Sequence, residues 1–549
     1  MKRQISLFLF LIFYFASFSQ TYQKYWVYLK DKNNSPYTVS KPMEFLSFKA
    51  IERRMLQGIS IDESDLPVNP IYIQALKDKG VDIYNVSKWI NAVSVSTDDQ
   101  TVIETIKSLP FVLAVKPVIS MIDPSRGITK EKFEPIISVD FPAFTTTRYG
   151  ATLNQIKMIG IDTLHALGYT GKGIDIAVFD GGFINVNLIN FFQVAQKEQR
   201  IHAVWNYVDG DTNVYSRSFH GTAVMSVMCA NLPNTMIGAA PDANYYLFIT
   251  EDTYNESRVE EDNWASAAEK ADSMGVMIFS TSLGYTEFDS ISTNHTYLEM
   301  NGDSTVITKA ANIAASKGIL VVNSAGNEGN SSWRYISAPS DGDSVLCIGA
   351  VYPNRVLANF SSRGPNSSGH LKPNVCASGA QIFVATVENE VSTSNGTSFS
   401  CPLVAASAAC LWQAFPAKRS MEIFHAIEAC SDRFISPDYD YGFGIPNFFV
   451  AFKKYEAETH NNPLEVFPKV VPTVFNNSFS VLWKDATDAT VTFNLYDEKG
   501  ARLSNQKLFL PKNEVQKVYF SDLADYQAGM YLMKVSDGKK VSTFRLMKY

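Results

Sequence analysis

Three hydroxyl side chains stand close together in the segment SNGTSFSCP, residues 394–402. Thr397, Ser398 and Ser400 follow a glycine and precede a run of small apolar residues. Such residues often serve only as caps at the start of a buried helix. A serine becomes a nucleophile when a base takes its proton and a third group orients that base. Whether one of these hydroxyls reacts therefore depends on partners elsewhere in the chain.

Histidine is the commonest catalytic base, and the chain has seven. They form no HxH or HExxH pair, which disfavours a zinc hydrolase. His220 stands out in SFHGTAVMSVM, because it precedes a glycine, a threonine and a predicted helix of small apolar residues. A lone histidine is usually structural or solvated, so its context makes His220 the candidate for a general base.

Two polar residues follow predicted buried strands. Asp180 closes the apolar run IDIAVFD, where a carboxylate is costly unless it is paired. It could belong to a turn or a helix cap, or it could orient a histidine by accepting the Nδ1 proton. Asn327, in VVNSAGNEG, could be a loop amide in left-handed backbone or a donor to the oxyanion of a substrate carbonyl.

The candidate residues must be positioned by strands and helices, which the sequence predicts from apolar runs that alternate with helical patterns. Runs rich in β-branched residues predict buried strands at 173–180, 275–284, 318–326, 345–351 and 380–386. Ala-rich patterns predict helices at 262–275 and 306–318, each ending at a glycine. The alternation predicts an α/β fold with a mainly parallel sheet covered by helices on both faces. In such a sheet, functional sites form beyond the carboxyl ends of the strands.

Four segments together carry a family resemblance. AVFDGG, HGTAVMSVM, SAGNEG and NGTSFSCPLVAA resemble the signature blocks of subtilisin-like serine proteases, the subtilases. They occur in the family's order Asp, His, Ser, with Asp180 and His220 40 residues apart and His220 and Ser398 178 residues apart. TSLGY, NFSSRGP and DYGFGIPN resemble further blocks of the family. The resemblance covers roughly residues 149–455 and implies a subtilisin-like, doubly wound peptidase domain there.

The resemblance also implies a role for each candidate residue. Asp180 would orient His220, His220 would act as general base, and Ser398 would be the nucleophile. Asn327 would form the oxyanion hole together with the backbone N–H of Ser398. The pocket for the substrate residue before the scissile bond would be walled by Ser282, Leu283, Gly284, Ala325 and Gly326.

Two residues depart from the family pattern. The family usually has Ser or Thr after its catalytic Asp, whereas this chain has Gly181. It usually has Met after its catalytic Ser, whereas this chain has Phe399. Neither residue moves a proton, so we expect altered local packing and retained chemistry.

The N-terminal part of the chain predicts a leader and a small folded module. Lys2 and Arg3 precede an apolar run of 15 residues, which predicts a signal peptide at 1–19. A membrane anchor is the alternative, but the run is shorter than the ~20 residues that span a bilayer. Residues 20–148 are predicted to be a small α+β module and a linker. By its position and its α/β pattern the module resembles a subtilase propeptide, which implies a maturation cut within 123–149. The alternative for this module is a stable accessory domain.

The C-terminal part changes pattern after a polar linker predicted at 456–465. Residues 466–549 alternate apolar and polar residues and predict an antiparallel β-sandwich. FNLYDEKG, SDLADYQAGMYLMKV and FRLMKY resemble the sorting domains of proteins exported by the type IX (Por) system of Gram-negative bacteria. That resemblance implies the secretion machinery as a partner and a secreted or cell-surface location. The alternative is a sandwich that binds carbohydrate or another surface.

Composition restricts the partners and cofactors. The net charge is −7 and no long basic run occurs, which argues against a nucleic-acid partner. The six cysteines match no zinc motif, and they leave disulfides and buried free thiols equally open. Calcium sites are frequent in the family that the chain resembles, but no compact acidic loop marks one. We therefore name no metal ligand, leave calcium possible but unassigned, and expect no other cofactor.

These patterns favour a secreted serine endopeptidase that cleaves proteins or peptides through an acyl-enzyme intermediate. Its own propeptide would be an intramolecular inhibitor. One alternative is a non-catalytic surface adhesin built on a subtilisin-like scaffold. Another is a protease that processes only itself.

Overall fold

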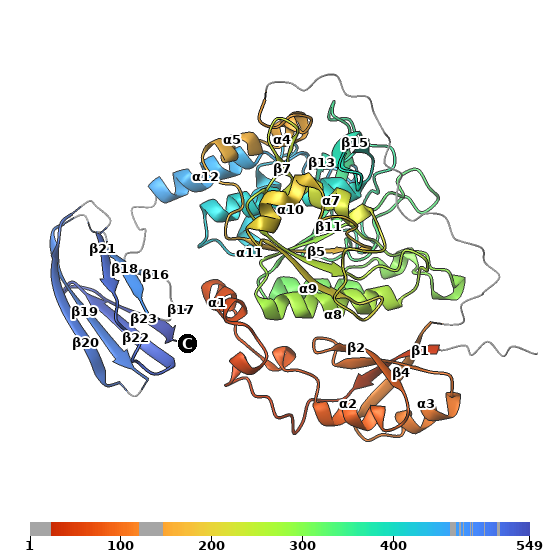
Figure 1. Cartoon of the computed structure of the whole chain (residues 1–549), viewed down its shortest axis with the longest axis horizontal. Helices are drawn as coiled ribbons and strands as arrows, with labels where there is room; N and C mark the ends of the chain where they lie inside the picture. The colour runs from red at the N-terminus through yellow and green to blue at the C-terminus, as the bar shows by residue number, and fades with distance from the viewer. Residues whose placement is uncertain are drawn as a thin grey trace, which may run out of the picture.

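The computed structural model in Figure 1 describes residues 23–119, 147–461 and most of 468–548. Within the last range, residues 472–473, 476, 484, 486, 499 and 513–515 are not described. The predicted signal peptide at 1–19 and most of the predicted cleavage segment at 123–149 lie outside the described residues. Within the described part of the chain, none of the helices has the length and apolar character needed to cross a membrane.

A seven-stranded sheet lies at the centre of the molecule, with strand order β13-β12-β11-β10-β5-β9-β6 (Figure 1). All of its neighbouring strands are parallel. In sheet order the strands are β13 Val375–Ser378, β12 Val345–Val351, β11 Leu320–Ser324, β10 Ile278–Thr281, β5 Asp175–Asp180, β9 Asn244–Ile249 and β6 Ile201–Asn206. The direction of winding reverses beside β5. Ligands of doubly wound sheets bind at such a switch point, and Asp180 ends the strand there.

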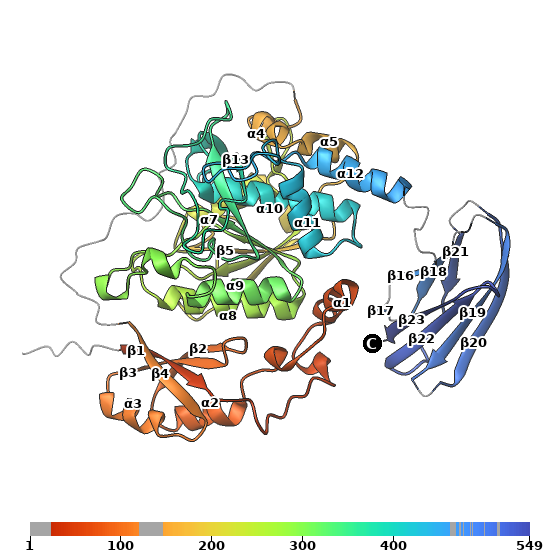
Figure 2. The same ribbon diagram turned by 180° about the vertical axis from the view of Figure 1, so that it is seen from behind.

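Helices cover both faces of this sheet, so its strands are buried on both sides (Figures 1 and 2). On one face lie α7 His220–Cys229 and α10 Thr397–Ala414, and on the other lie α8 Val259–Met274 and α9 Val306–Ser316. Strand β5 shows how its residues divide between the faces. Ile176 and Val178 belong to the core under α7 and α10, whereas Ala177 and Phe179 belong to the core under α8 and α9. This arrangement confirms the predicted α/β fold class.

One predicted strand pairs elsewhere. The prediction at 380–386 corresponds to β14 Ile382–Ala385, which forms an antiparallel two-stranded hairpin with β15 Val391–Ser394 outside the central sheet. Conversely, β6 and β9 belong to the sheet although the apolar pattern did not indicate them. In β6 only the two end residues are buried and the residues between them are partly or fully exposed, so this strand does not form a buried apolar run. Strand β9 has the sequence NYYLFI and is mostly buried, so its apolar residues were an available signal.

Shorter elements complete the peptidase region. They are α4 Leu153–Met158, α5 Ile161–Ala166, α6 Gln193–Lys197, α11 Ser420–Ala429, α12 Phe448–Asn461 and the hairpin β7 Asn231–Leu232 with β8 Met236–Ile237. Helix α12 extends into the segment that the sequence predicts as a linker from 456. The side chain of Tyr455 is buried, and its hydroxyl donates to the backbone oxygen of Glu422 at 2.7 Å, which anchors this end of the helix.

All six cysteines are free and buried. The structure therefore decides the open alternative in favour of thiols. Burial raises the pKa of Cys347 to about 11 and that of Cys229 to about 12. These thiols are protonated at neutral pH and act as small apolar core residues.

The N-terminal module is a four-stranded antiparallel sheet with strand order β2-β3-β1-β4. Its strands are β1 Gln23–Leu29, β2 Asp82–Ser87, β3 Ala92–Thr97 and β4 Val112–Ile119. Helices α2 Pro70–Lys77 and α3 Gln100–Lys107 cover one face, and the other face rests on α8 (Figures 1 and 2). A further helix, α1 Phe48–Gln57, also contacts α8. The elements match the predicted small α+β module.

The C-terminal region consists of a three-stranded sheet, β16-β18-β21, and a five-stranded sheet, β17-β23-β22-β19-β20. Apolar side chains from both sheets form one core. The pairs are antiparallel except that β17 runs parallel to β23. The strands are β16 Lys469–Val471, β17 Val474–Phe475, β18 Phe479–Trp483, β19 Ala489–Asp497, β20 Arg502–Leu510, β21 Gln516–Phe520, β22 Gly529–Ser536 and β23 Val541–Lys548.

Candidate active site

Asp180 and His220 form a buried pair at the switch point of the sheet. Asp180 ends β5 with no exposed surface, and both of its carboxylate oxygens lie 2.9 Å from Nδ1 of His220. The backbone N–H of Gly181 donates to Oδ1 of Asp180 at 2.7 Å. Burial raises the pKa of Asp180, while the contact with His220 and the Gly181 N–H favour the carboxylate and oppose that rise. The pair can hold one imidazole tautomer, with the proton on Nδ1.

His220 is the first residue of α7, and its own packing holds the ring. Its backbone N–H donates to the hydroxyl of Ser218 at 3.1 Å. The ring of Phe399 lies 5.8 Å from the imidazole, centroid to centroid, at 45°. Because Asp180 holds Nδ1, Nε2 on the other side of the ring points away from the carboxylate. Phe399, the departure from the family pattern, therefore packs beside the imidazole and carries no exchangeable proton.

Ser398 lies in the first turn of α10. Its hydroxyl donates to the backbone oxygen of Ser282 at 3.3 Å, and its own backbone oxygen accepts from the hydroxyl of Ser282 at 2.7 Å. That backbone oxygen would normally accept the N–H four residues later, but residue 402 is proline and has none. Ser282 thus supplies the missing donor and connects the end of β10 to the start of α10.

Asn327 is oriented by the residue before Ser398. Its Oδ1 accepts the backbone N–H and the hydroxyl of Thr397, both at 2.9 Å. This network assigns the amide nitrogen, Nδ2, to the opposite end of the side chain, where it is available as a donor. The backbone N–H of Gly326 donates to the same Thr397 hydroxyl at 3.2 Å. Thr397 therefore positions Asn327.

A groove of about 750 Å³ brings most of the predicted residues together. His220, Asn327 and Ser398 line it, as do Ser282, Leu283, Gly284 and Gly326. Asp180 lies behind His220. Ala325 does not line the groove, because its side chain packs with Ile336 and Cys347 in a small apolar cluster. The prediction for Ala325 as a wall of the pocket is therefore not matched by its side chain.

The groove also has lining residues that the sequence did not single out. Among them are Glu251, Glu256, Glu287, Glu328 and Ser337. Glu251 follows β9, a strand that the apolar pattern missed, and Glu256 lies in the connection from β9 to α8. The acidic stretch EDTYNESRVEED at 251–262 was the available signal.

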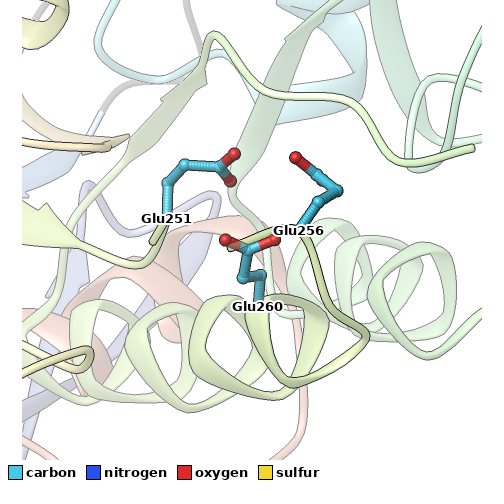
Figure 3. Close-up of side chains that lie close together, drawn as sticks. All are labelled: Glu251, Glu256 and Glu260. Atoms are coloured by element: carbon cyan, nitrogen blue, oxygen red, sulfur yellow. The ribbon is translucent and has the colours of Figure 1, made fainter. Parts of the chain in front are cut away.

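Among the described residues, one group of acidic side chains could hold a metal ion, namely Glu251, Glu256 and Glu260 (Figure 3). One oxygen from each lies within 4.8 Å of the others. Two of these side chains already accept protein donors: Tyr285 O–H to Glu251 at 2.7 Å, and the backbone N–H of Asp252 to Glu260 at 2.7 Å. Calcium prefers six to eight oxygen ligands. One oxygen from each of the three carboxylates gives fewer ligands than calcium prefers, so these side chains alone do not complete a calcium site.

Comparison with known proteins decides the family of the central region. Residues 171–444 match the Peptidase_S8 model, the subtilase family. Residues 171–444 form a subtilase domain. Residues 24–132 match a Peptidase S8 propeptide domain described for Bacteroidota. Neither match extends into residues 466–549, so the resemblance to a type IX sorting domain stays a prediction.

Individual relatives agree with this subtilase assignment. Subtilisin E from Bacillus subtilis strain 168 is 27% identical over 376 residues, covering 68% of this chain and 83% of the relative. Subtilisin DY from Bacillus licheniformis is 26% identical over 295 residues, which cover 53% of this chain and 95% of the relative. An alkaline protease from Alkalihalobacillus alcalophilus is 25% identical over 333 residues, which cover 60% of this chain and 78% of the relative. The matches support assignment of the chain as a serine protease with a propeptide.

The propeptide domain docks on α8 through buried charges. Glu269 accepts the backbone N–H groups of Lys88 and Trp89 at 2.7 and 3.1 Å. Arg54 from α1 lies 3.0 Å from Asp272 of α8. The indole N–H of Trp26 donates to the buried carboxylate of Asp262. Helix α8 thus contributes Glu260 to the group of carboxylates beside the groove, and it contributes Asp262, Glu269 and Asp272 to the contact with the propeptide.

Proposed function

We propose that the chain is a secreted serine endopeptidase that hydrolyses peptide bonds through Asp180, His220 and Ser398. The observation that carries the proposal is the Asp180–His220 pair, at 2.9 Å, beside a groove that His220 and Ser398 both line. Membership of the central domain in the subtilase family supports the same chemistry.

The reaction follows from these positions. The Ser398 hydroxyl attacks the substrate carbonyl while Nε2 of His220 takes its proton, and Asp180 stabilises the imidazolium that forms. The oxyanion accepts hydrogen bonds from the Ser398 backbone N–H and from Nδ2 of Asn327. The C–N bond then breaks, and His220 passes the proton to the leaving amine. Water hydrolyses the acyl-enzyme by the same route, and the chain's own groups supply each proton transfer.

A nucleophile replacement tests this function. Ser398→Ala is expected to abolish casein cleavage and labelling by a fluorophosphonate probe, because both require the same hydroxyl. Ser400→Ala is a matched control, since its hydroxyl donates within the helix to the backbone oxygen of Thr397 at 3.0 Å. Purified Ser398→Ala protein that still cleaved casein would rule the function out. A wild-type chain that is not labelled would favour the adhesin alternative, and one that is labelled but cleaves only itself would favour self-processing.

We further propose that the propeptide keeps the enzyme inactive until it is cut within 123–149, and that a signal peptide and the C-terminal sandwich direct export. The sandwich would be the sorting domain for type IX secretion to the medium or the cell surface of a Gram-negative bacterium. The propeptide match supports the first part, and the sequence pattern of residues 466–549 supports the second. Deleting residues 466–549 should leave the protease inside the cell envelope, whereas normal export of the shortened chain would disprove the sorting role.

A further inference from the structure

The groove that contains Ser398 is acidic. Glu251, Glu256, Glu287 and Glu328 line it, and its described lining residues include no Lys or Arg. A cleft lined by charges of one sign concentrates their field and attracts ligands of the opposite sign. The groove is therefore electrostatically suited to a cationic substrate.

Two of these glutamates belong to a cluster of three carboxylates (Figure 3). Glu251 projects from the end of β9, and Glu260 rises from the first turn of α8. Glu256 comes from the connection between them, and the three carboxylates point into the same space. Glu251 and Glu256 line the groove, whereas Glu260 is buried beneath them with 1% of its surface exposed. Mutual repulsion of three carboxylates falls when a cation binds among them.

Neutral donors surround this cluster. The Tyr285 hydroxyl donates to Glu251 at 2.7 Å, and the backbone N–H of Ser257 donates to Glu260 at 3.2 Å. Burial, followed by the charges of these glutamates, holds the pKa of Tyr285 well above its usual value, so the phenol remains a neutral donor.

The arginines of the adjoining segments are engaged with other groups. Arg217 pairs with Asp209 at 2.8 Å and with Asp252 at 3.0 Å. Arg258 donates to the backbone oxygen of Thr293 at 2.6 Å. Neither lines the groove.

A second polar feature faces the same groove and is independent of the glutamates. Ser337 lines the groove with 3% of its surface exposed, and its hydroxyl has no hydrogen-bond partner among the described residues. A Cβ atom added at Gly284 would lie 2.1 Å from this hydroxyl, and one added at Gly326 would lie 3.2 Å from it. The hydroxyl thus sits between the two predicted wall glycines. A buried hydroxyl without a partner is costly, and a polar ligand atom would satisfy it.

We propose that the groove selects substrates with Lys or Arg on the N-terminal side of the scissile bond. Glu251 and Glu256 would bind the cationic end of that side chain, and Ser337 would hydrogen-bond a polar side chain that enters between Gly284 and Gly326. The inference rests on the proposed function, because it takes the groove to be the peptide-binding cleft.

Peptides with a chromogenic leaving group test this selectivity. The set carries Arg, Lys, Ala or Glu at each of the four positions before the bond in turn. At one or more positions, Arg and Lys are expected to exceed Ala in kcat/KM by about tenfold or more, with Glu below Ala. Glu251→Gln and Glu256→Gln should each lower the Arg-to-Ala ratio by about tenfold, and Glu256→Lys should invert the preference between Arg and Glu. Glu198→Gln is the control, since Glu198 pairs with Arg200 outside the groove, and it should keep the wild-type ratio.

The outcomes separate this inference from the proposed function. Wild-type enzyme that cleaves casein through Ser398 but treats Arg and Ala peptides alike would overturn the inference and leave the function standing. A chain that neither cleaves casein nor reacts with the fluorophosphonate would overturn both. If about 1 mM CaCl2 stabilises the wild type against heat but not Glu256→Gln, and no peptide preference exists, the cluster is a metal site and the proposal is wrong.

Discussion

The hydroxyl of Ser282 donates a 2.7 Å hydrogen bond to the backbone oxygen of Ser398, and that oxygen lacks its helical donor because residue 402 is proline. The bond joins the end of a central strand to the first turn of the helix that presents the candidate nucleophile. Ser398 thereby depends on a side chain 116 residues earlier in the chain for the geometry of its own backbone.

Removing that donor should cost stability, and restoring the helical one should recover it. Ser282→Ala leaves the buried oxygen without a partner, so the unfolding free energy should fall by about 1–3 kcal/mol. Pro402→Ala supplies a backbone N–H at the correct helical position. The cost of Ser282→Ala should therefore be smaller in the Pro402→Ala background, as measured by a double-mutant cycle of thermal unfolding. Equal costs in the two backgrounds would show that Pro402 does not create the need for Ser282.

Asp180→Asn tests the pairing of the imidazole. The amide cannot hold the Nδ1 proton as a carboxylate does, so kcat should fall by about 10⁴ with little change in fold. Asp175→Asn, at the opposite end of the same strand, is the control and should leave kcat unchanged.

Asn327→Asp separates the two ends of that side chain. The new carboxylate can still accept from Thr397, but it has no N–H for the developing oxyanion. The expected result is a fall of about 10²–10³ in kcat, with retained thermal stability. A Thr397→Val variant is a useful comparison, because it should misplace Asn327 without removing its donor and should lose less activity. A wild-type kcat for Asn327→Asp would exclude the amide from the oxyanion hole.

Two glycines distinguish backbone strain from obstruction of the groove. Gly326 has φ +103° and Gly369 has φ +84°, so alanine at either position is strained by about 1–3 kcal/mol. A Cβ at Gly326 would also lie 2.9 Å from the hydroxyl of Ser362 and close to Ser337, whereas Gly369 has open space. Both variants should melt earlier. Only Gly326→Ala should also lower kcat/KM, and equal kcat/KM values would argue against Gly326 as a pocket wall.

Two buried carboxylates of α8 should respond oppositely to replacement at the propeptide interface. Asp272 contacts Arg54 at 3.0 Å, and although burial alone would raise its pKa, Lys88, Arg53 and Arg54 lower it well below the usual 3.8. Its stabilising contribution is therefore present above about pH 4 and is lost below. In a Ser398→Ala precursor, Asp272→Asn should destabilise the chain by about 3–5 kcal/mol at pH 7, measured by thermal unfolding.

Replacing Asp262 is expected to change the stability in the opposite direction. Burial first, and then the nearby charge of Glu261, raise its pKa well above the usual 3.8. Its ionised form therefore costs stability, and this cost grows as the pH rises above the usual value. Asp262→Asn keeps an acceptor for the Trp26 indole and removes the charge. This variant should melt higher than its parent at pH 8, with a difference that shrinks toward pH 5, and a constant or negative difference would contradict the buried charge.

The sequence alone predicted the fold class and seven of the residues that line the groove. Asp180, His220, Asn327 and Ser398 each lie in a short block whose residue types reveal both the local element and its end. A parallel strand that helices cover on both faces has apolar residues at successive positions. Such strands of the central sheet could therefore be predicted from the sequence. Such local patterns need no knowledge of which segments meet.

Contacts between distant segments were decided only by the tertiary structure. Apolar periodicity indicates burial but not the pairing partner, so it could not show that β14 pairs with β15 outside the central sheet. Strand β6 escaped prediction because exposed residues lie between its two buried ends. The sequence also could not show that the side chain of Ala325 packs against Ile336 and Cys347, because these residues are distant or off its own strand. The convergence of Glu251, Glu256 and Glu260 and the hydrogen bond from Ser282 to Ser398 depend on how the chain crosses over the sheet. Spacing along the sequence cannot reveal them, because packing sets these distances.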